Sequence, residues 1–172
     1  MRRLILFTAL VTSAAIAAPL AQSLPPATQA TPPGTFSHPS GYQITLPAGW
    51  SVDERAAPAD VRLMAADRTG LIEVTSGVVT VALDPVSYGA GWESRAIGPS
   101  QLLKTKRGGA TVKIGERPAY AGTYENAEVI SKVVFLWTPG RFFTFAATFA
   151  RDNFANGEAL FDRMVQSLKL PG

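Results

Sequence analysis

The chain has 172 residues, one histidine and no cysteine, and its 16 basic residues are nearly balanced by 13 acidic ones. Without cysteine it can form neither disulfides nor a lipidated lipoprotein anchor, and one histidine cannot complete the usual zinc sites. We therefore expect no cofactor and no metal.

Residues 1–21 have the organisation of a secretory signal. Arg2 and Arg3 form a charged start, residues 4–18 are apolar and uncharged, and small residues follow. Removing this segment leaves 14 basic and 13 acidic residues, a net charge of +1. A nucleic-acid-binding protein normally carries a clear basic field, so we expect no nucleic-acid partner.

A secreted chain without cysteine fits a bacterial envelope better than a disulfide-stapled extracellular domain. We expect export to the periplasm or the extracellular space. The alternative is an uncleaved segment that anchors the protein in the membrane, although the apolar run is shorter than the ~20 residues of a typical span.

Two segments follow the signal. Residues 22–35 are rich in proline, threonine and alanine and carry no charge, so we interpret them as a disordered or extended linker. Residues 36–172 have the length of one domain and can bury a core without metals or disulfides. We expect this domain to be a monomer.

The domain opens with patterns typical of half-buried strands. Residues 42–46 alternate polar and apolar side chains, a turn follows at residues 47–49, and a second strand starts at Trp50. Residues 53–60 are polar and alanine-rich, which indicates a loop or short helix. Residues 61–65 predict a further strand.

The next segment has a less regular pattern. Residues 71–83 predict either one long bulged strand or a hairpin broken at Ser76 and Gly77, and we favour two strand segments. Residues 85–98 contain several glycines together with two large aromatic residues, and we interpret them as an irregular loop.

A short helix is predicted over residues 99–107. Pro99 suits its first turn, basic residues suit its last turn, and two glycines at 108 and 109 end it. Strands at residues 111–114 and 117–124 then surround a turn.

Residues 129–170 are the densest apolar stretch after the signal, and they predict a strand, a tight turn, a strand and a helix. In the turn Thr138-Pro139-Gly140-Arg141, proline presets the backbone and Gly140 adopts a positive φ. The register that follows places Trp137 opposite Phe142 and Leu136 opposite Phe143. One face then carries Ile130, Val134, Leu136, Phe143, Phe145 and Phe149, and the other carries Val133, Phe135, Trp137, Phe142, Thr144 and Thr148.

Both faces of this hairpin are apolar enough to need a cover. This favours an α+β domain, an antiparallel β-sheet flanked by helices in an α/β/α sandwich. The last helix supplies one cover, because apolar residues recur at helical spacing from Leu160 to Leu168. Asn156 is its expected N-cap, with Glu158 in the first turn. We expect Phe145 to pack on this helix against Phe161, Met164 or Val165.

The start of the domain resembles the opening of PsbP-like domains, with the pattern Gly41-Tyr42-x-Ile44-x-Leu46-Pro47-x-Gly49-Trp50. That family includes extrinsic photosystem subunits, the Ran-binding Mog-type protein and many small bacterial envelope proteins. The closing order of two long strands and a C-terminal helix is also similar, so the resemblance covers residues 36–170. It implies an antiparallel sheet between helices and an accessory role. The histidines that metal-binding relatives would need are missing here.

No stretch of the chain carries a recognisable reaction centre. A Ser-His-Asp triad would have to use His38, and no nucleophile-elbow or phosphate-loop motif occurs. Residues 89–94 begin like a dinucleotide fingerprint but lack its third glycine. Carboxylates that the fold brings together remain the open catalytic alternative.

One cluster is a candidate binding surface, in which aromatic residues are followed by basic ones: Tyr88, Trp92, Arg95, Lys104, Lys106 and Arg107. These side chains suit an anionic partner such as a phospholipid head group, and thus a peripheral contact with a membrane surface. The alternative is a Trp92 side chain folded back onto the core, beside a solvated basic helix end.

Two functional hypotheses result. The first is an exported, non-catalytic module that binds an envelope protein or assists assembly, as the PsbP-like resemblance implies. The second is an envelope hydrolase that uses carboxylates brought together by the fold. No motif identifies the partner of the first or the substrate of the second.

Overall fold

A computed structural model describes residues 34–53, 59–81, 84–98 and 101–171. The predicted signal and all but the last two residues of the predicted linker lie outside these ranges, as does most of the predicted loop or short helix at residues 53–60. No helix among the described residues is long and apolar enough to cross a bilayer.

The main sheet has seven strands, each antiparallel to its neighbours. A small second sheet pairs β1 (Thr35–Ser37) with β2 (Gln43–Thr45). The strands of the main sheet lie in the order β3 (Trp50–Asp53), β4 (Val61–Ala65), β5 (Gly70–Val78), β9 (Arg141–Ala150), β8 (Val129–Thr138), β7 (Arg117–Glu125) and β6 (Thr105–Ile114). Helix α1 (Pro85–Ala96) follows β5, and the 3-10 helix η1 (Arg151–Asn153) leads directly into α2 (Phe154–Gln166).

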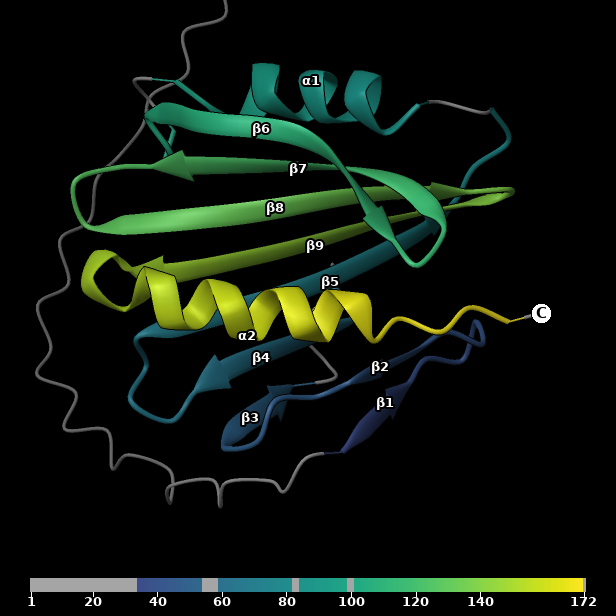
Figure 1. The fold of residues 1–172 in the computed structure, drawn as a ribbon, viewed down its shortest axis with the longest axis horizontal. Helices are drawn as coiled ribbons and strands as arrows, with labels where there is room; N and C mark the ends of the chain where they lie inside the picture. Colours follow the sequence, from purple (N-terminus) through teal and green to yellow (C-terminus); the bar gives the residue numbers. More distant parts are fainter. Residues whose placement is uncertain (1–33, 54–58, 82–83, 99–100, 172) are drawn as a thin grey trace, which may run out of the picture.

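The two helices cover opposite faces of the main sheet (Figure 1). Helix α1 packs on β7 and β8, whereas α2 packs on β9 and on β2. The β1–β2 hairpin closes the same face as α2, because Phe36, Tyr42 and Ile44 join the core under that helix. The predicted α+β fold, an antiparallel sheet between helices, is confirmed.

The C-terminal hairpin has the predicted register. Trp137 pairs with Phe142, and Leu136 pairs with Phe143. Gly140 in the turn has a φ of +77°, a conformation that only glycine adopts without steric cost. Because successive residues of a strand point to opposite faces, this register also confirms the two predicted faces.

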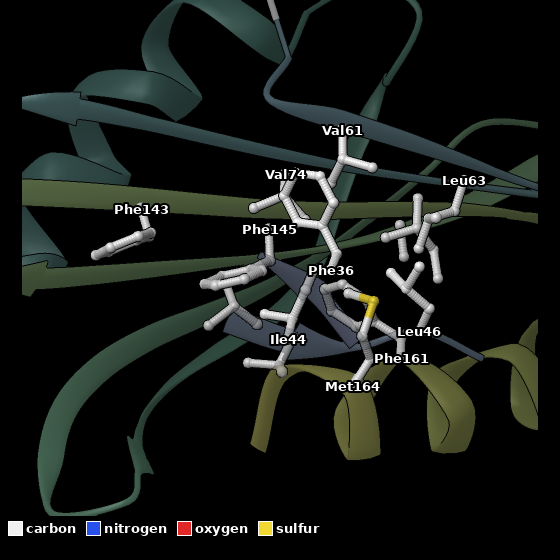
Figure 2. Packing of buried hydrophobic residues seen from close by; sticks show 14 of the residues in the cluster. Phe36, Ile44, Leu46, Val61, Leu63, Val74, Phe143, Phe145, Phe161 and Met164 are labelled. Atoms are coloured by element: carbon white, nitrogen blue, oxygen red, sulfur yellow. The ribbon is translucent and has the colours of Figure 1, made fainter. Parts of the chain in front are cut away.

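The core under α2 is the larger of two apolar clusters. Phe145 belongs to the same buried cluster as residues of α2, as predicted, and Figure 2 shows Phe145 and Phe161 within this packing. The side chains that β9 and α2 contribute are each at most 3% exposed, namely Phe143, Phe145, Phe149, Phe161, Met164 and Val165.

Residues 85–96 form helix α1, so the irregular loop expected there is wrong. Asp84 caps the helix, since its carboxylate accepts hydrogen bonds from two backbone amides of the first turn at 3.0 Å, and Pro85 suits the first position. Gly89 lowers the helix propensity but allows close packing. A Cβ there would lie 2.6 Å from a carbon of the Tyr120 ring. The glycine therefore marks an approach to the sheet and not a loop.

The short helix expected over residues 99–107 is also wrong. Residues 105–107 begin strand β6, and the two glycines after them lie inside that strand; residues 99 and 100 lie outside the described part of the chain. Gly109 pairs with Gly122 of β7, and the Tyr120 hydroxyl fills the space that a side chain at Gly109 would need. Packing between strands overrides the local helix signal.

Strand β5 runs unbroken through Ser76 and Gly77, so the expected division of residues 71–83 into two segments is wrong. Gly77 pairs with Phe142 across β5 and β9. The ring of Phe142 lies over the glycine, where an added Cβ would meet it at 2.3 Å. An aromatic side chain that covers a cross-strand glycine stabilises the sheet at the position where the sequence indicated a break.

The predicted start of α2 needs correction. Asn156 is not the N-cap, because η1 continues into α2 and makes Asn153 the cap residue. The Asn153 side chain caps no helical amide and instead donates to the Thr69 hydroxyl at 2.7 Å. Glu158 lies beyond the first turn and binds Lys132 at 2.8 Å.

The hairpin yields a test of its two faces. Phe145→Ala should lower the free energy of unfolding by roughly 3–5 kcal/mol, because it removes a fully buried ring and leaves a cavity. Phe142→Ala should cost less, since Phe142 is only half-buried over Gly77. Urea denaturation of the chain without its first 21 residues compares the two. A larger loss for Phe142→Ala would contradict the assignment of the main core to the α2 side.

Candidate functional site

Helix α1 lays two aromatic side chains on the sheet. The ring of Tyr88 lies 5.4 Å from the rings of Phe135 and Phe142, centroid to centroid. The Trp92 ring lies 5.2 Å from Tyr124 and 5.5 Å from Phe135. Both side chains are half-buried, so the aromatic part of the candidate surface faces mainly the core.

Glu93 is the centre of a polar cluster beneath α1. Its carboxylate accepts hydrogen bonds from the Tyr124 hydroxyl at 2.7 Å and from the Tyr120 hydroxyl at 3.2 Å. The Lys106 ammonium lies 2.9 Å from the same carboxylate, donates to Tyr120 at 2.7 Å and lies 5.4 Å from the centre of its ring. The cluster therefore ties α1 to β6 and β7, which come 13 to 31 residues later in the chain.

The pKa values in this cluster follow from burial and charge. Burial by itself raises the pKa of the Glu93 carboxyl, but hydrogen bonds from Lys106 and Tyr124 outweigh it and hold that pKa below its ordinary value. Burial, reinforced by the hydrogen bond to Glu93, raises the pKa of the Tyr124 hydroxyl. At neutral pH Glu93 is thus a carboxylate beside the Lys106 ammonium and the neutral Tyr124 phenol, which suits a structural ion pair.

The basic residues of the candidate surface divide into two groups. Lys106 and Arg107 are paired with carboxylates, Lys106 with Glu93 and Arg107 with Glu125 at 3.6 Å. Arg95 and Lys104 are exposed, and the Lys104 ammonium donates to the backbone carbonyl of Gln101. The structure brings Lys106 to the aromatic residues through Glu93, whereas an anionic partner for the whole cluster stays a prediction.

A second surface feature was missed by the sequence analysis. Near the β8–β9 turn, Val78 at the end of β5 and Val81 in the segment that follows have 76% and 63% of their surface exposed. A groove of about 360 Å³ runs between this segment and the turn, and it is lined mainly by apolar side chains. We call the apolar residues here the end patch, which comprises Val78, Val79, Val81, Trp137 and Pro139.

The end patch is held in place by contacts on both sides. The Val79 amide donates to the Gly140 carbonyl at 3.1 Å, so β5 and the turn stay joined beyond the last strand pair. Tyr88 packs on Trp137 with ring centroids 5.5 Å apart, which joins α1 to the same end. The patch is distinguished by the exposure of its valines. The alternation of residues in a strand does not predict that exposure.

Several described carboxylates form ion pairs with basic side chains. Glu73 binds Arg62 at 2.6 Å. Glu158 and Asp162 both bind Lys132 at 2.8 Å and thereby attach α2 to β8. Among the described residues, no three of His, Asp and Glu lie close enough together to hold a metal ion.

His38 lies between a serine and an aspartate without forming a catalytic triad. Its Nδ1 lies 2.7 Å from the Ser40 hydroxyl and also accepts from the Ser40 amide at 3.2 Å, which is a local turn. Its Nε2 lies 3.9 Å from Asp60, too far for a hydrogen bond. Asp60 instead accepts from the Tyr42 hydroxyl at 2.8 Å, so this group stabilises the start of the domain.

Solved structures show the fold class to which this arrangement belongs. The chain is similar to CyanoP, the cyanobacterial PsbP protein of Synechocystis sp. PCC 6803, with 18% identity, a TM-score of 0.64, and 88% of this chain and 99% of that chain covered. It is also similar to LpqN of Mycobacterium tuberculosis, a protein involved in cell envelope biogenesis, with 17% identity, a TM-score of 0.54, and coverage of 80% and 90%. A protein of Bacteroides thetaiotaomicron aligns with 13% identity and a TM-score of 0.60, over 83% of this chain and 50% of its own.

These similarities show that the domain has the PsbP-like fold. No family model matches the chain, and no curated protein matches it by sequence. The PsbP-like part of the sequence resemblance is therefore supported at the level of fold, and a relation to the Mog-type protein stays a prediction.

The Glu93 cluster predicts a pH-dependent contribution to stability. Glu93→Gln should lower the free energy of unfolding at pH 7 by about 1–3 kcal/mol, because it removes the charged acceptor of two phenols and an ammonium. The folded-state pKa lies below the unfolded value of about 4.3. The contribution is therefore complete above that value and is lost as pH falls through the folded pKa.

Urea denaturation between pH 3 and pH 7 measures this contribution. The difference between the parent protein and Glu93→Gln should shrink as the pH is lowered. Glu116→Gln serves as the control, because that side chain is 98% exposed and lies 4.0 Å from Lys113. A difference that stays constant with pH would show that Glu93 acts without its charge.

Proposed function

We propose that the protein is an exported, non-catalytic accessory module of the cell envelope that binds another envelope protein through the end patch. The observation that carries this proposal is the exposure of Val78 and Val81 beside the groove that Trp137 and Pro139 line. These valines lie outside the buried core, so packing of the core does not explain why they are apolar. Clustered apolar surface of this kind is typical of protein contacts.

The chemistry of the patch favours an apolar side chain of a partner protein as its occupant. The groove of about 360 Å³ has the size to receive one or two large side chains, and Trp137 in its wall is of a residue type enriched in binding hot spots. Val86 in the first turn of α1 is 45% exposed and adds apolar surface on the α1 side. The structural similarity to a cyanobacterial PsbP protein and to a protein involved in cell envelope biogenesis supports an accessory role.

The alternative of a carboxylate hydrolase finds less support. Glu73 is bound to Arg62, Glu93 to Lys106 and Glu158 to Lys132, so these carboxylates are occupied by structural ion pairs. The basic and aromatic cluster of Tyr88, Trp92, Arg95, Lys104, Lys106 and Arg107 is proposed as a secondary contact for an anionic partner or the membrane surface, next to the end patch through Tyr88.

A variant pair tests the end patch. Val81→Asp places a charge in the patch, and Met64→Asp changes an exposed apolar residue of β4, 38% exposed, away from it. Immobilised domains are incubated with envelope extract, and the retained proteins are quantified by mass spectrometry. At least one protein should be retained by the parent and by Met64→Asp and lost about tenfold or more with Val81→Asp, since desolvating a charge costs more than a valine contact gains.

Equal retention by all three domains would contradict the proposal. Binding that depends on Val81 but goes to lipid vesicles instead of a protein would reassign the patch to the membrane. Melting curves of both variants must match that of the parent, which is expected because both side chains are exposed.

Export is tested separately from binding. The protein expressed in a bacterial host should fractionate with the envelope or medium, with a new N-terminus after Ala17 or Ala21. Leu10→Arg, which interrupts the apolar run, should leave the full-length chain in the cytoplasm. A parent protein that begins at Met1 and stays in the cytoplasm would contradict export; a full-length chain in the membrane would show an anchor.

A further inference from the structure

A second groove lies on the face of the sheet that α2 covers, between α2 and the segment that follows β2. Its volume is about 440 Å³, within the range of small-molecule sites. Leu46 and Pro47 form one wall, and Leu160 and Met164 of α2 form the other. Figure 2 shows Leu46 and Met164 near each other beside Phe161, so the floor of the groove continues into the main core.

The groove is built by hydrogen bonds that fix its two walls. Gln43 and Lys169 exchange backbone hydrogen bonds at 2.9 Å, which attaches β2 to the chain after α2. The Ser167 hydroxyl accepts from the Thr45 amide at 2.8 Å and donates to the Met164 carbonyl at 2.6 Å. These contacts hold the β2 segment at a set distance from the helix, so the groove is formed before any ligand arrives.

The rim of the groove carries one cation. Arg163 lies on the exposed side of α2 and lines the groove. Within the described part of the chain, no acidic side chain lies within ion-pair distance of Arg163, whereas the nearby carboxylates of Glu158 and Asp162 are both bound to Lys132. The guanidinium is therefore available to an anion that enters from solvent.

We propose that this groove binds a small amphipathic carboxylate of the fatty-acid type, with its aliphatic chain between Leu46 and Leu160 and its carboxylate on Arg163. The apolar walls favour the chain, and the planar guanidinium favours the carboxylate, to which it can donate two parallel hydrogen bonds. A fatty-acid-type ligand has both an aliphatic chain for the apolar walls and a carboxylate for the guanidinium. This site is independent of the end patch, with which it shares no lining residue.

The gain in affinity expected from the carboxylate decides which ligands the experiment must compare. An exposed ion pair contributes little, whereas a bidentate pair beside apolar walls contributes more. We therefore expect the carboxylate to improve affinity by at least about fivefold over an uncharged head group on the same chain.

The experiment follows octanoate binding to the domain by amide chemical shifts. Octanol carries the same chain without the charge, and acetate carries the charge without the chain. Saturable shifts are expected at Leu46, Ala48 and the last turn of α2 with octanoate, weaker binding with octanol, and none with acetate. Arg163→Gln should reduce the octanoate affinity to that of octanol, and Lys113→Gln, a change at a 73% exposed cation outside the groove, should leave it unchanged.

A blocking variant provides a second readout. Ala48 is an exposed residue of the groove, so Ala48→Trp should fill the groove while the melting temperature and the dispersion of the spectrum stay those of the parent. Octanoate binding should then be lost. This variant does not depend on the charge of Arg163 and separates occupancy of the groove from a general charge effect.

Several outcomes would overturn the site. Equal affinity for octanoate and octanol, unchanged binding by Arg163→Gln or Ala48→Trp, or no saturable binding would each exclude recognition of the carboxylate in this groove. Shifts at Val81 and Trp137 would place the ligand in the end patch. Binding of vesicles containing phosphatidylglycerol that needs Arg163, without octanoate binding, would assign the arginine to a membrane surface. Apart from shifts at Val81 and Trp137, these results do not bear on the protein partner of the end patch.

Discussion

The pairing of β8 with β9 is the constraint on which the other elements depend. Their register directs Phe145 to one face and Phe135 to the other, and each face then requires its own cover. Strand β5 pairs with β9 on one side and β7 with β8 on the other, so the hairpin is the centre of the sheet. A shift by one residue would exchange both faces and leave each helix over the wrong side chains.

The two covers are held by different forces. Helix α2 contributes buried apolar side chains to the main core, and Lys132 adds two ion pairs at its edge. Helix α1 has only Gly89 fully buried, and its contact with the sheet combines two half-buried aromatics with the Glu93 cluster. A buried carboxylate is costly unless it is paired and hydrogen-bonded. Lys106, Tyr120 and Tyr124 meet both conditions, and they explain why a helix with so little apolar surface stays on the sheet.

The sequence was sufficient for those parts of the fold that depend on short-range periodicity. The dense apolar content of residues 129–150 predicted the hairpin, the turn at residues 138–141 predicted its register, and helical spacing predicted the cover that includes Phe161. It failed at Gly77, Gly89 and Gly109, which indicated a break, a loop and a helix end. At each of these positions the missing side chain makes room for an aromatic ring from a distant strand. Local patterns contain no information about such contacts.

The candidate surfaces could likewise be predicted only in part from the sequence. Tyr88, Trp92 and the basic residues near them could be selected from composition, but their pairing depends on Glu93, a residue that carried no signal of its own. Its partners lie 13 to 31 residues later in the chain and are brought to it only by the β6–β7 pairing. The end patch and the α2 groove consist of ordinary apolar residues, and only the exposure of their side chains distinguishes them from the core.

Both apolar surfaces are preorganised, and this matters more for binding than their size. The hydrogen bond between Val79 and Gly140 fixes the end patch, and the bonds of Ser167 fix the α2 groove. A surface that is already ordered loses little conformational entropy when a partner arrives, so a larger share of the apolar burial appears as affinity. The end patch and the α2 groove share no lining residue, and the central strand β8 of the sheet is mostly buried. Binding at one of these surfaces could affect the other only through an element that has two alternative packings. The continuous, close-packed core around Phe145 opposes such an element.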